Sequence, residues 1–218
     1  VKVNQHSVVH LPDAVSFTDA ATALVAAATA WELARRVDIK PGETVLVNAA
    51  GGAVGSAGVQ IAHLAGARVL ASAGADDKLE RARQLGADAG INYASHDLLA
   101  EVLRLTDGRG VDAVLETVGG EVLRQSLEAL VPNGRLATAG SIGRAKTEID
   151  IYRLLRKQVW MTGTHFAPKQ SIRDVLALLA EGKLRPVLAA SLPLAEARAA
   201  HELLESRQFF GNIVLTVG

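Results

Sequence analysis

Short apolar segments alternate with helix-like segments along most of the chain, and this order limits the folds that the chain can adopt. The apolar segments have the length of buried strands and occupy residues 44–50, 68–74, 89–93, 111–118, 134–141 and 158–166. Helical spacing occupies residues 53–66, 76–85, 97–106, 121–130 and 169–181. Strands that are apolar throughout and are separated by helices form parallel sheets covered on both faces. The sequence therefore predicts an α/β protein with a doubly wound parallel sheet of strand order 3-2-1-4-5-6.

The two ends of the chain depart from this alternation. The opening stretch, "VKVNQHSVVHLPDAVSF", has the alternating polarity of a strand, and a helix is predicted at about 18–36. At the other end, a helix at 194–205 and the strand "NIVLTVG" follow the apolar stretch "RPVLAASLPL". We expect these terminal segments to belong to a second domain whose bulk lies outside these residues.

Composition argues against several classes of protein. Lys and Arg number 23 together, as do Asp and Glu, so neither a nucleic acid nor an anionic membrane surface is an expected partner. The longest apolar stretch, residues 20–30, is too short to cross a bilayer. The chain has no cysteine, which removes disulfides and thiolate chemistry and fits a reducing compartment. We therefore expect a cytoplasmic protein.

Three glycines separate the first strand from its helix, in the stretch "NAAGGAVGSAGVQIAHLAG" (48–66). The pattern Ala50-x-Gly52-x-x-Gly55 matches a dinucleotide-binding fingerprint, with alanine in place of the first glycine. The second glycine lets the backbone approach a pyrophosphate, and the third allows close helix–strand packing. The helix begins at Ala53 and Val54, whose free amides are expected to face the anion. An ordinary tight turn is the alternative, but the position between strand and helix favours dinucleotide binding.

The end of the second strand distinguishes between the two nicotinamide dinucleotides. An NAD site places an acidic residue there against the ribose 2′-hydroxyl, whereas this chain has the neutral stretch Ser72–Gly74. Asp76 and Asp77 follow, where a helix favours caps and negative charge, so capping is their expected role. Small neutral residues leave room for a 2′-phosphate, which Lys78 is placed to meet unless it is only a solvated surface lysine. The sequence therefore predicts NADP(H) as cofactor, with Ser72 beside it.

Four stretches together resemble the medium-chain dehydrogenase/reductase superfamily, especially its quinone oxidoreductase (zeta-crystallin-like) branch. They are "AAGGAVGSAGVQIA", "KLERARQLGADAGINY", "GRGVDAVLETVGG" and "LPLAEARAAHELLESRQFFGNIVLTV". The resemblance covers nearly the whole chain and implies a dinucleotide-binding Rossmann domain at 23–185. It also implies that residues 1–22 and 186–218 are pieces of a GroES-like catalytic domain, most of which is missing from the chain.

The resemblance assigns further residues to the cofactor site. Lys78, Tyr93 and Arg207 match positions that grip the adenosine 2′-phosphate in the quinone oxidoreductase branch. Two cations and a phenol donor suit a dianionic phosphate, although a surface lysine, a strand-end tyrosine and a helix-end arginine are the alternatives. Ligands of open α/β sheets lie beyond the carboxyl ends of the strands. Four residues at such ends are therefore expected on the nicotinamide side: Val118, Gly119, Gly140 and Ser141.

No metal site is predicted within the chain. Zinc members of the superfamily supply one catalytic ligand, usually cysteine, from the region that corresponds to "LVAAATAW" (24–31), where this chain has no such ligand. The six histidines lack the spacing of metal ligands, and only His165 follows a strand near the expected pocket. Thr29 is a weak candidate for contact with substrate or carboxamide, and a bond to its own helix backbone is the alternative.

These features predict zinc-independent hydride transfer from NADPH to a quinone or an α,β-unsaturated carbonyl. Tyr152-x-x-x-Arg156 has arginine where short-chain dehydrogenases need lysine, and Ala73 argues against a methyltransferase. Two alternatives stay open: an isolated NADP-binding module or fragment without turnover, and a relative of the zinc-type alcohol dehydrogenases. The strand at 158–166 is predicted to form a sheet edge through which two copies make a homodimer. An edge covered by the 169–181 helix or by the missing domain is the alternative.

Overall fold

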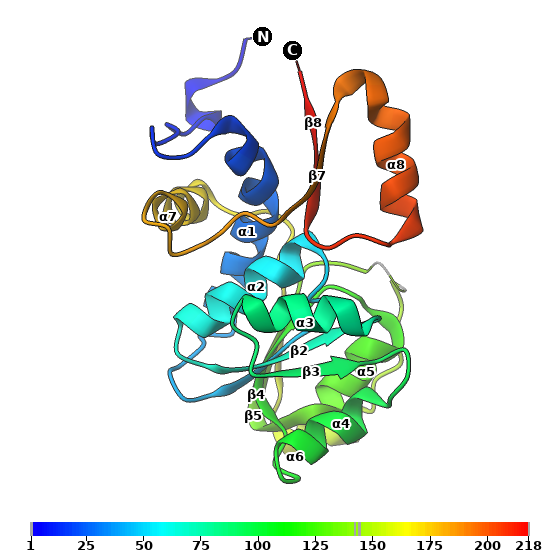
Figure 1. Ribbon diagram of the computed structural model, residues 1–218. Helices are drawn as coiled ribbons and strands as arrows, with labels where there is room; N and C mark the ends of the chain where they lie inside the picture. Colours follow the sequence, from blue (N-terminus) through cyan, green and yellow to red (C-terminus); the bar gives the residue numbers. More distant parts are fainter. Residues whose placement is uncertain (1, 142, 144, 218) are drawn as a thin grey trace.

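A six-stranded parallel sheet forms the centre of the protein, and its computed structural model describes residues 2–141, 143 and 145–217. The strand order β3-β2-β1-β4-β5-β6 confirms the predicted winding. Helices α2 and α4 lie on opposite sides of this sheet (Figure 1). Val1 and Gly218, which end the predicted segments 1–22 and 186–218, lie outside the described residues. The strands are β1 Thr44–Val47, β2 Arg68–Ala73, β3 Ala89–Asn92, β4 Val111–Glu116, β5 Leu130–Thr138 and β6 Trp160–Gly163.

Helices precede, separate and follow these strands. None in the described part of the chain is both long and apolar enough to cross a membrane. The side chain of Ser16 accepts the N–H of Asp19 at 3.0 Å and thereby caps the first helix, whose many alanines allow close packing on its neighbours. The α-helices are α1 Phe17–Arg36, α2 Ala53–Leu64, α3 Asp76–Gln84, α4 Leu98–Leu105, α5 Gly120–Ala129, α6 Ile151–Lys157, α7 Lys169–Ala180 and α8 Ala197–Ser206.

Successive residues of each central strand face two separate cores. Val45 and Val47 of β1 pack into the core that α1, α2 and α7 cover, whereas Leu46 packs into the core that α4 and α5 cover. All three side chains are almost completely buried. Because helices cover both faces of the sheet and exclude water from them, the strands consist of apolar residues throughout and do not alternate between apolar and polar residues.

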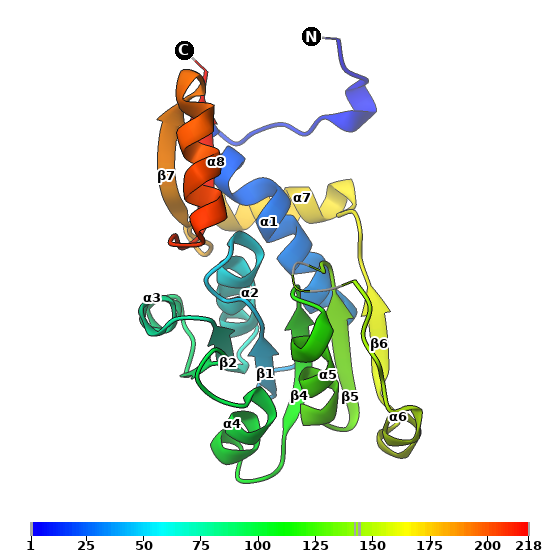
Figure 2. The same ribbon diagram turned by 90° about the vertical axis from the view of Figure 1, so that its right-hand side faces the viewer.

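The C-terminal segment forms a small unit beside the sheet. Strands β7 Leu188–Pro193 and β8 Asn212–Thr216 pair in parallel, and the 3₁₀ turn η2 Leu194–Glu196 and α8 connect them. This unit lies at the end of the molecule toward which the arrows of β1, β4 and β6 point (Figure 2).

The prediction of a strand at the start of the chain was wrong. Residues Gln5–Ser7 form a 3₁₀ turn, η1, in which the side chain of Asn4 accepts the N–H of His6 at 2.9 Å.

Two further differences from the sequence-based expectation lie around β5. The strand predicted at 134–141 begins earlier, at Leu130, because β5 includes an irregularity where the pairing with β4 shifts and Asn133 adopts φ 61°. Helix α6 was not predicted at all. Its signals are Asp150, whose carboxylate accepts the N–H of Arg153 at 3.2 Å, and the stop at Gln158, which is in the left-handed region.

Candidate functional site

The turn between β1 and α2 lies at the carboxyl edge of the sheet, and two of its glycines have different tasks. A Cβ at Gly55 would overlap the carbonyl oxygen of Ala49, so only glycine lets α2 pack this closely on the end of β1. A Cβ at Gly52 would meet only that same oxygen, at 3.4 Å. Gly55 is therefore enclosed by protein, whereas the space that a side chain at Gly52 would fill is largely free.

The first amides of α2 are available to an anion. Among the described residues, no acceptor receives the N–H of Ala53, Val54 or Gly55. The first turn of α2 holds no acidic residue, so nothing local compensates the positive end of the helix dipole. Ala50 is completely buried and donates its N–H to the Ser72 carbonyl at 2.9 Å, and this bond fixes the turn to β2.

Ser72 belongs to a buried polar network instead of an open crevice. Its hydroxyl donates to Asn48 Oδ1 at 2.7 Å, and Asn48 Nδ2 donates to the Ser126 hydroxyl at 2.8 Å. All three side chains are fully buried, and they tie the ends of β1 and β2 to α5. The hydroxyl of Ser72 is thus already bonded within the protein, and a place for Ser72 beside a cofactor stays a prediction. Because buried polar groups need partners, this network fixes the position of the glycine turn.

Lys78, Tyr93 and Arg207 come from separate elements and lie together beyond the ends of β2 and β3. Lys78 Nζ donates to the Arg207 carbonyl at 2.6 Å and lies 5.8 Å from the ring centre of Phe209. Burial raises the pKa of Tyr93, and the positive charge of Arg207 opposes that rise. A Cβ at Gly74 would lie 3.4 Å from the Tyr93 ring. The structure therefore brings one phenol and two cations to one edge.

A buried carboxylate shapes the loop after β4. Oε1 of Glu116 accepts the N–H groups of Val118 and Gly119 at 2.6 and 2.9 Å, and Oε2 accepts the Thr138 hydroxyl at 3.0 Å. Burial raises the pKa of Glu116, and these hydrogen bonds oppose the rise. This role of Glu116 was not predicted from the sequence. Its signal was an acidic residue at the end of an otherwise apolar strand.

The loops that follow β4 and β5 lie side by side. The N–H of Gly143 donates to the Val118 carbonyl at 2.7 Å, and a Cβ at Gly140 would lie 2.7 Å from the Thr117 carbonyl oxygen. Ser141 is exposed next to them. An open pocket of about 910 Å³ adjoins these loops, and its lining includes Val118, Gly119, Gly143 and Lys146.

Other sequence candidates are engaged elsewhere. The Thr29 hydroxyl donates to the Val25 carbonyl at 2.7 Å, which is the helix-backbone alternative. His165 is exposed, and its ring centre lies 4.2 Å from that of Phe166. Within residues 2–141, 143 and 145–217, no group of three or more His, Cys, Asp or Glu side chains could hold a metal ion.

Asp76 and Asp77 do not cap α3 as predicted. The N-cap residue is Ala75, and no side chain makes a capping bond there. Asp76 instead accepts the Asn92 side-chain amide at 2.8 Å, which joins the start of α3 to the end of β3. Both carboxylates still lie in the first turn, where negative charge favours a helix.

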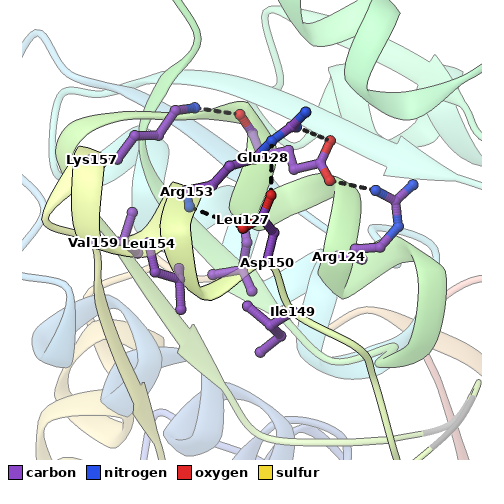
Figure 3. Close-up of a pocket in the computed structure, with 9 residues that line it drawn as sticks. All are labelled: Arg124, Leu127, Glu128, Ile149, Asp150, Arg153, Leu154, Lys157 and Val159. Carbon is purple, nitrogen blue, oxygen red and sulfur yellow. Dashed lines mark hydrogen bonds and ion pairs between the residues drawn. The ribbon is translucent and has the colours of Figure 1, made fainter.

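A small, partly open hollow lies at the opposite end of the sheet, where α5 meets α6 (Figure 3). Glu128 pairs there with Arg124 and Arg153, and Lys157 donates to the carbonyls of Glu128 and Leu130 at 2.6 and 2.7 Å. The cavity volume is about 20 Å³, which is room for about one water molecule. These charges satisfy one another and the last carbonyls of α5, so the hollow has a structural role.

Comparison with known proteins agrees with this geometry. Residues 53–181 match the family model of zinc-binding dehydrogenases. The chain is 33% identical to part of a phenolphthiocerol/phthiocerol polyketide synthase of Mycobacterium tuberculosis, over 96% of this chain and 10% of that protein. The crystal structure of an NAD-dependent alcohol dehydrogenase superposes with a TM-score of 0.89 at 38% identity, over 99% of this chain and 63% of the other. For the Escherichia coli quinone oxidoreductase complexed with NADPH, the TM-score is 0.85 at 30% identity, over 95% and 67%.

The chain thus spans less than two thirds of the first two of these proteins. The match to the family model nevertheless extends from the first residue of α2 to just beyond α7, so it includes Gly55, the Glu116 loop and five of the six strands of the sheet. This chain belongs to the zinc-binding dehydrogenase family, within the medium-chain dehydrogenase/reductase superfamily.

Proposed function

We propose that this chain binds NADP(H) and takes part in hydride transfer to a quinone or an α,β-unsaturated carbonyl. The observation that carries the proposal is the meeting of Lys78, Tyr93 and Arg207 beyond the ends of β2 and β3. The similar Escherichia coli quinone oxidoreductase, whose structure contains NADPH, supports both parts of it. When bound, the nicotinamide supplies the hydride, and the protein provides binding, orientation and electrostatics.

Each part of the dinucleotide has residues of matching chemistry. The amides of Ala53 and Val54 and the bare backbone at Gly52 would hold the pyrophosphate. Two cations, Lys78 and Arg207, would pair with the 2′-phosphate, and Tyr93 would donate its hydroxyl hydrogen. Four loop residues would border the nicotinamide: Val118, Gly119, Gly140 and Ser141. No described residue is assigned as proton donor, because the Thr29 hydroxyl already bonds its own helix.

Titration of the purified chain with NADPH and NADH tests the cofactor. NADPH should bind at least about tenfold more tightly, since a hydrogen bond between charged groups contributes about 1.5–3 kcal/mol. Arg207→Ala should weaken NADPH binding and leave NADH binding unchanged. Equal affinities of the unmodified chain for the two dinucleotides would contradict the proposed 2′-phosphate site.

Two alternatives differ from this proposal in measurable ways. The first alternative is that NADH is the cofactor, which the likeness to an NAD-dependent alcohol dehydrogenase favours. The titration with NADPH and NADH distinguishes the two cofactors. A nucleotide-binding module without turnover would bind NADPH but would not oxidise it in the presence of a simple quinone. Consumption of NADPH with such a quinone, followed by the loss of its near-ultraviolet absorbance, separates the enzyme from the module.

We also propose that the hydride transfer does not use zinc, although the family name refers to that metal. Residues 24–31 of α1 carry no cysteine, histidine or carboxylate, and the described residues provide no cluster of metal ligands. The described side chains therefore do not fit a zinc site. Assay of the longest available form of the protein before and after chelation is the test.

The edge strand β6 supports a proposed homodimer. Trp160 is 70% exposed and Met161 is 42% exposed, so α7 leaves much of this edge uncovered. Three exposed apolar side chains of α6 precede them: Ile151, Tyr152 and Leu155. Pairing of two β6 edges would bury this surface and satisfy the free strand edge. Trp160→Lys should then convert a dimer to a monomer in sedimentation experiments.

The division of the chain and its location complete the proposal. Residues 1–22 and 186–218 would belong to a catalytic domain that packs on a Rossmann domain at 23–185. The separate β7–β8 sheet supports this division, although α1 runs through its first boundary. A cytoplasmic location is proposed from the absence of cysteine in the sequence.

A further inference from the structure

Gly51 lies directly against the side chain of Lys78. A Cβ at position 51 would stand 2.6 Å from Lys78 Cδ and 3.2 Å from both Cβ and Cγ of the same lysine. The aliphatic stem of Lys78 therefore lies across the glycine turn and occupies the space that any side chain at position 51 would need. Neither fingerprint glycine, Gly52 or Gly55, makes this contact.

Lys78 and Gly51 are also joined through the segment that follows α8. The ammonium of Lys78 donates to the Arg207 carbonyl at 2.6 Å, and Arg207 is in the left-handed region with φ 56°. Four residues later, the N–H of Gly211 donates to the Gly51 carbonyl at 3.0 Å, and Gly211 forms a bridge with Gly52. The glycine turn, the first turn of α3 and residues 207–211 thus fix one another.

We propose that Gly51 determines the specificity for NADP(H) over NAD(H) by leaving room for Lys78. This inference rests on the proposed function, because it assigns the Lys78 ammonium to the 2′-phosphate. An ammonium has three N–H donors, so the bond to the Arg207 carbonyl leaves two for the phosphate. A methyl group at position 51 displaces the lysine stem and moves the ammonium away from Arg207 and Tyr93. The pyrophosphate contacts at Gly52, Ala53 and Val54 stay in place.

The fold should tolerate this methyl group. Gly51 is not among the glycines with positive φ, so alanine can adopt its backbone conformation. The atoms that it would meet belong to a flexible side chain that reaches the surface. Gly211 is different, because it has φ 97° and a Cβ there would overlap the carbonyl oxygen of Val187. Gly51→Ala therefore tests the lysine without breaking the turn.

Calorimetric titration of NADPH and NADH into four forms of the chain tests the proposal: the unmodified chain, Gly51→Ala, Lys78→Met and the double variant. Gly51→Ala should weaken NADPH about tenfold, as the loss of one charge-assisted hydrogen bond does, and should change NADH less than about twofold. In the Lys78→Met background, Gly51→Ala should have no further effect on NADPH, because the ammonium is already gone. Gly52→Ala serves as the contrast and should weaken both dinucleotides equally, through the pyrophosphate.

The results separate the role of Gly51 from the proposed function itself. An unchanged ratio of NADPH to NADH affinity in Gly51→Ala, with NADPH binding to the unmodified chain intact, overturns the role of Gly51 alone. Additive losses in the double variant also overturn it, because they place the effect of Gly51 outside Lys78. Absence of binding of either dinucleotide to the unmodified chain overturns the proposed function and this inference with it. A thermal unfolding midpoint within a few degrees of the unmodified chain shows that Gly51→Ala has kept the fold.

Discussion

The carboxylate of Glu116 accepts the backbone N–H of Gly119 at 2.9 Å, while Gly119 adopts φ 79° and ψ −169°. Only glycine adopts this conformation readily. Glu116 has no cationic partner among the described residues, and its side chain is fully buried at the end of β4. A buried acid and a glycine thus set the shape of the loop beside the proposed nicotinamide site.

Glu116→Gln should be tolerated better than Glu116→Leu. The amide oxygen of glutamine can accept the same two backbone N–H groups, and its NH₂ group can donate to the Thr138 hydroxyl. Leucine leaves the buried amide of Gly119 without an acceptor, which costs about 1–3 kcal/mol. Urea unfolding of the two variants measures the difference. Equal losses of stability would show that the carboxylate does not hold the loop.

The difference in stability between the unmodified protein and Glu116→Gln should depend on pH. Because the pKa of Glu116 is raised in the folded state, the unfolded chain releases the proton first as the pH rises above about 4.5. The contribution of Glu116 is therefore complete below that pH and is lost as the pH rises through the raised value. Between pH 4 and 8, the free energy of unfolding of the unmodified protein should therefore fall relative to that of Glu116→Gln. Parallel pH profiles would contradict the raised pKa.

Gly55→Ala should destabilise the protein far more than Gly58→Ala, although both substitutions lie in α2. A Cβ at Gly55 overlaps the carbonyl oxygen of Ala49, which belongs to the backbone and cannot move alone. A Cβ at Gly58 meets only the side chains of Val47 and Leu115, at 3.3 and 3.4 Å. We expect a loss of about 1–3 kcal/mol or more for Gly55→Ala and less than about 1 kcal/mol for Gly58→Ala. Chemical denaturation of both variants provides the measurement.

Ser72→Ala should lower stability without changing the affinity for NADPH. The variant leaves Oδ1 of buried Asn48 without the hydroxyl that it accepts at 2.7 Å, a loss of about 1–3 kcal/mol. Ser126→Ala removes the other partner of Asn48 and should behave in the same way. Thermal unfolding and NADPH titration are both needed here. Weaker NADPH binding in a stable Ser72→Ala variant would support the prediction that Ser72 lies in the cofactor site.

Glu32 joins α1 to α7, and Glu32→Gln should reveal this contact at neutral pH. The buried carboxylate accepts hydrogen bonds from Arg35 at 3.1 and 3.2 Å and from the Ser171 hydroxyl. Burial raises the pKa of Glu32, but the bonds from Arg35 and Ser171 and the charges of Arg35 and Arg36 outweigh it, so the pKa falls below 4.5. The resulting stability is present above about pH 4.5 and is lost as the pH falls through the lowered value.

The free energy of unfolding of Glu32→Gln should therefore lie about 1–3 kcal/mol below that of the unmodified protein at pH 7. The two should converge in acid. Ser171→Ala, which removes only the α7 partner, should give part of the same loss. A gap that persists unchanged at the lowest pH would contradict the assignment to the Glu32 carboxylate.

The order of elements was predictable because it depends on short-range pattern. All six central strands and their winding follow from apolar runs separated by helical spacing, and Gly52 and Gly55 stand at the first strand–helix junction, where three glycines cluster. Strand and helix ends shifted by a few residues. Helix α6 was missed because its seven residues are too few to show a period.

The sequence by itself determined the sheet, its two apolar faces and the glycine turn, because local propensity and burial act on neighbouring residues. Only the tertiary structure decided which polar groups are left free for a ligand. In the folded protein the Ser72 hydroxyl is part of a buried hydrogen-bond network, Glu116 accepts the N–H of Gly119, and the stem of Lys78 packs against Gly51. Contacts such as Ser72–Asn48 and Lys78–Arg207 join residues 24 and 129 positions apart, and the Glu116 loop depends on exact backbone angles. Neither composition nor periodicity carries that information.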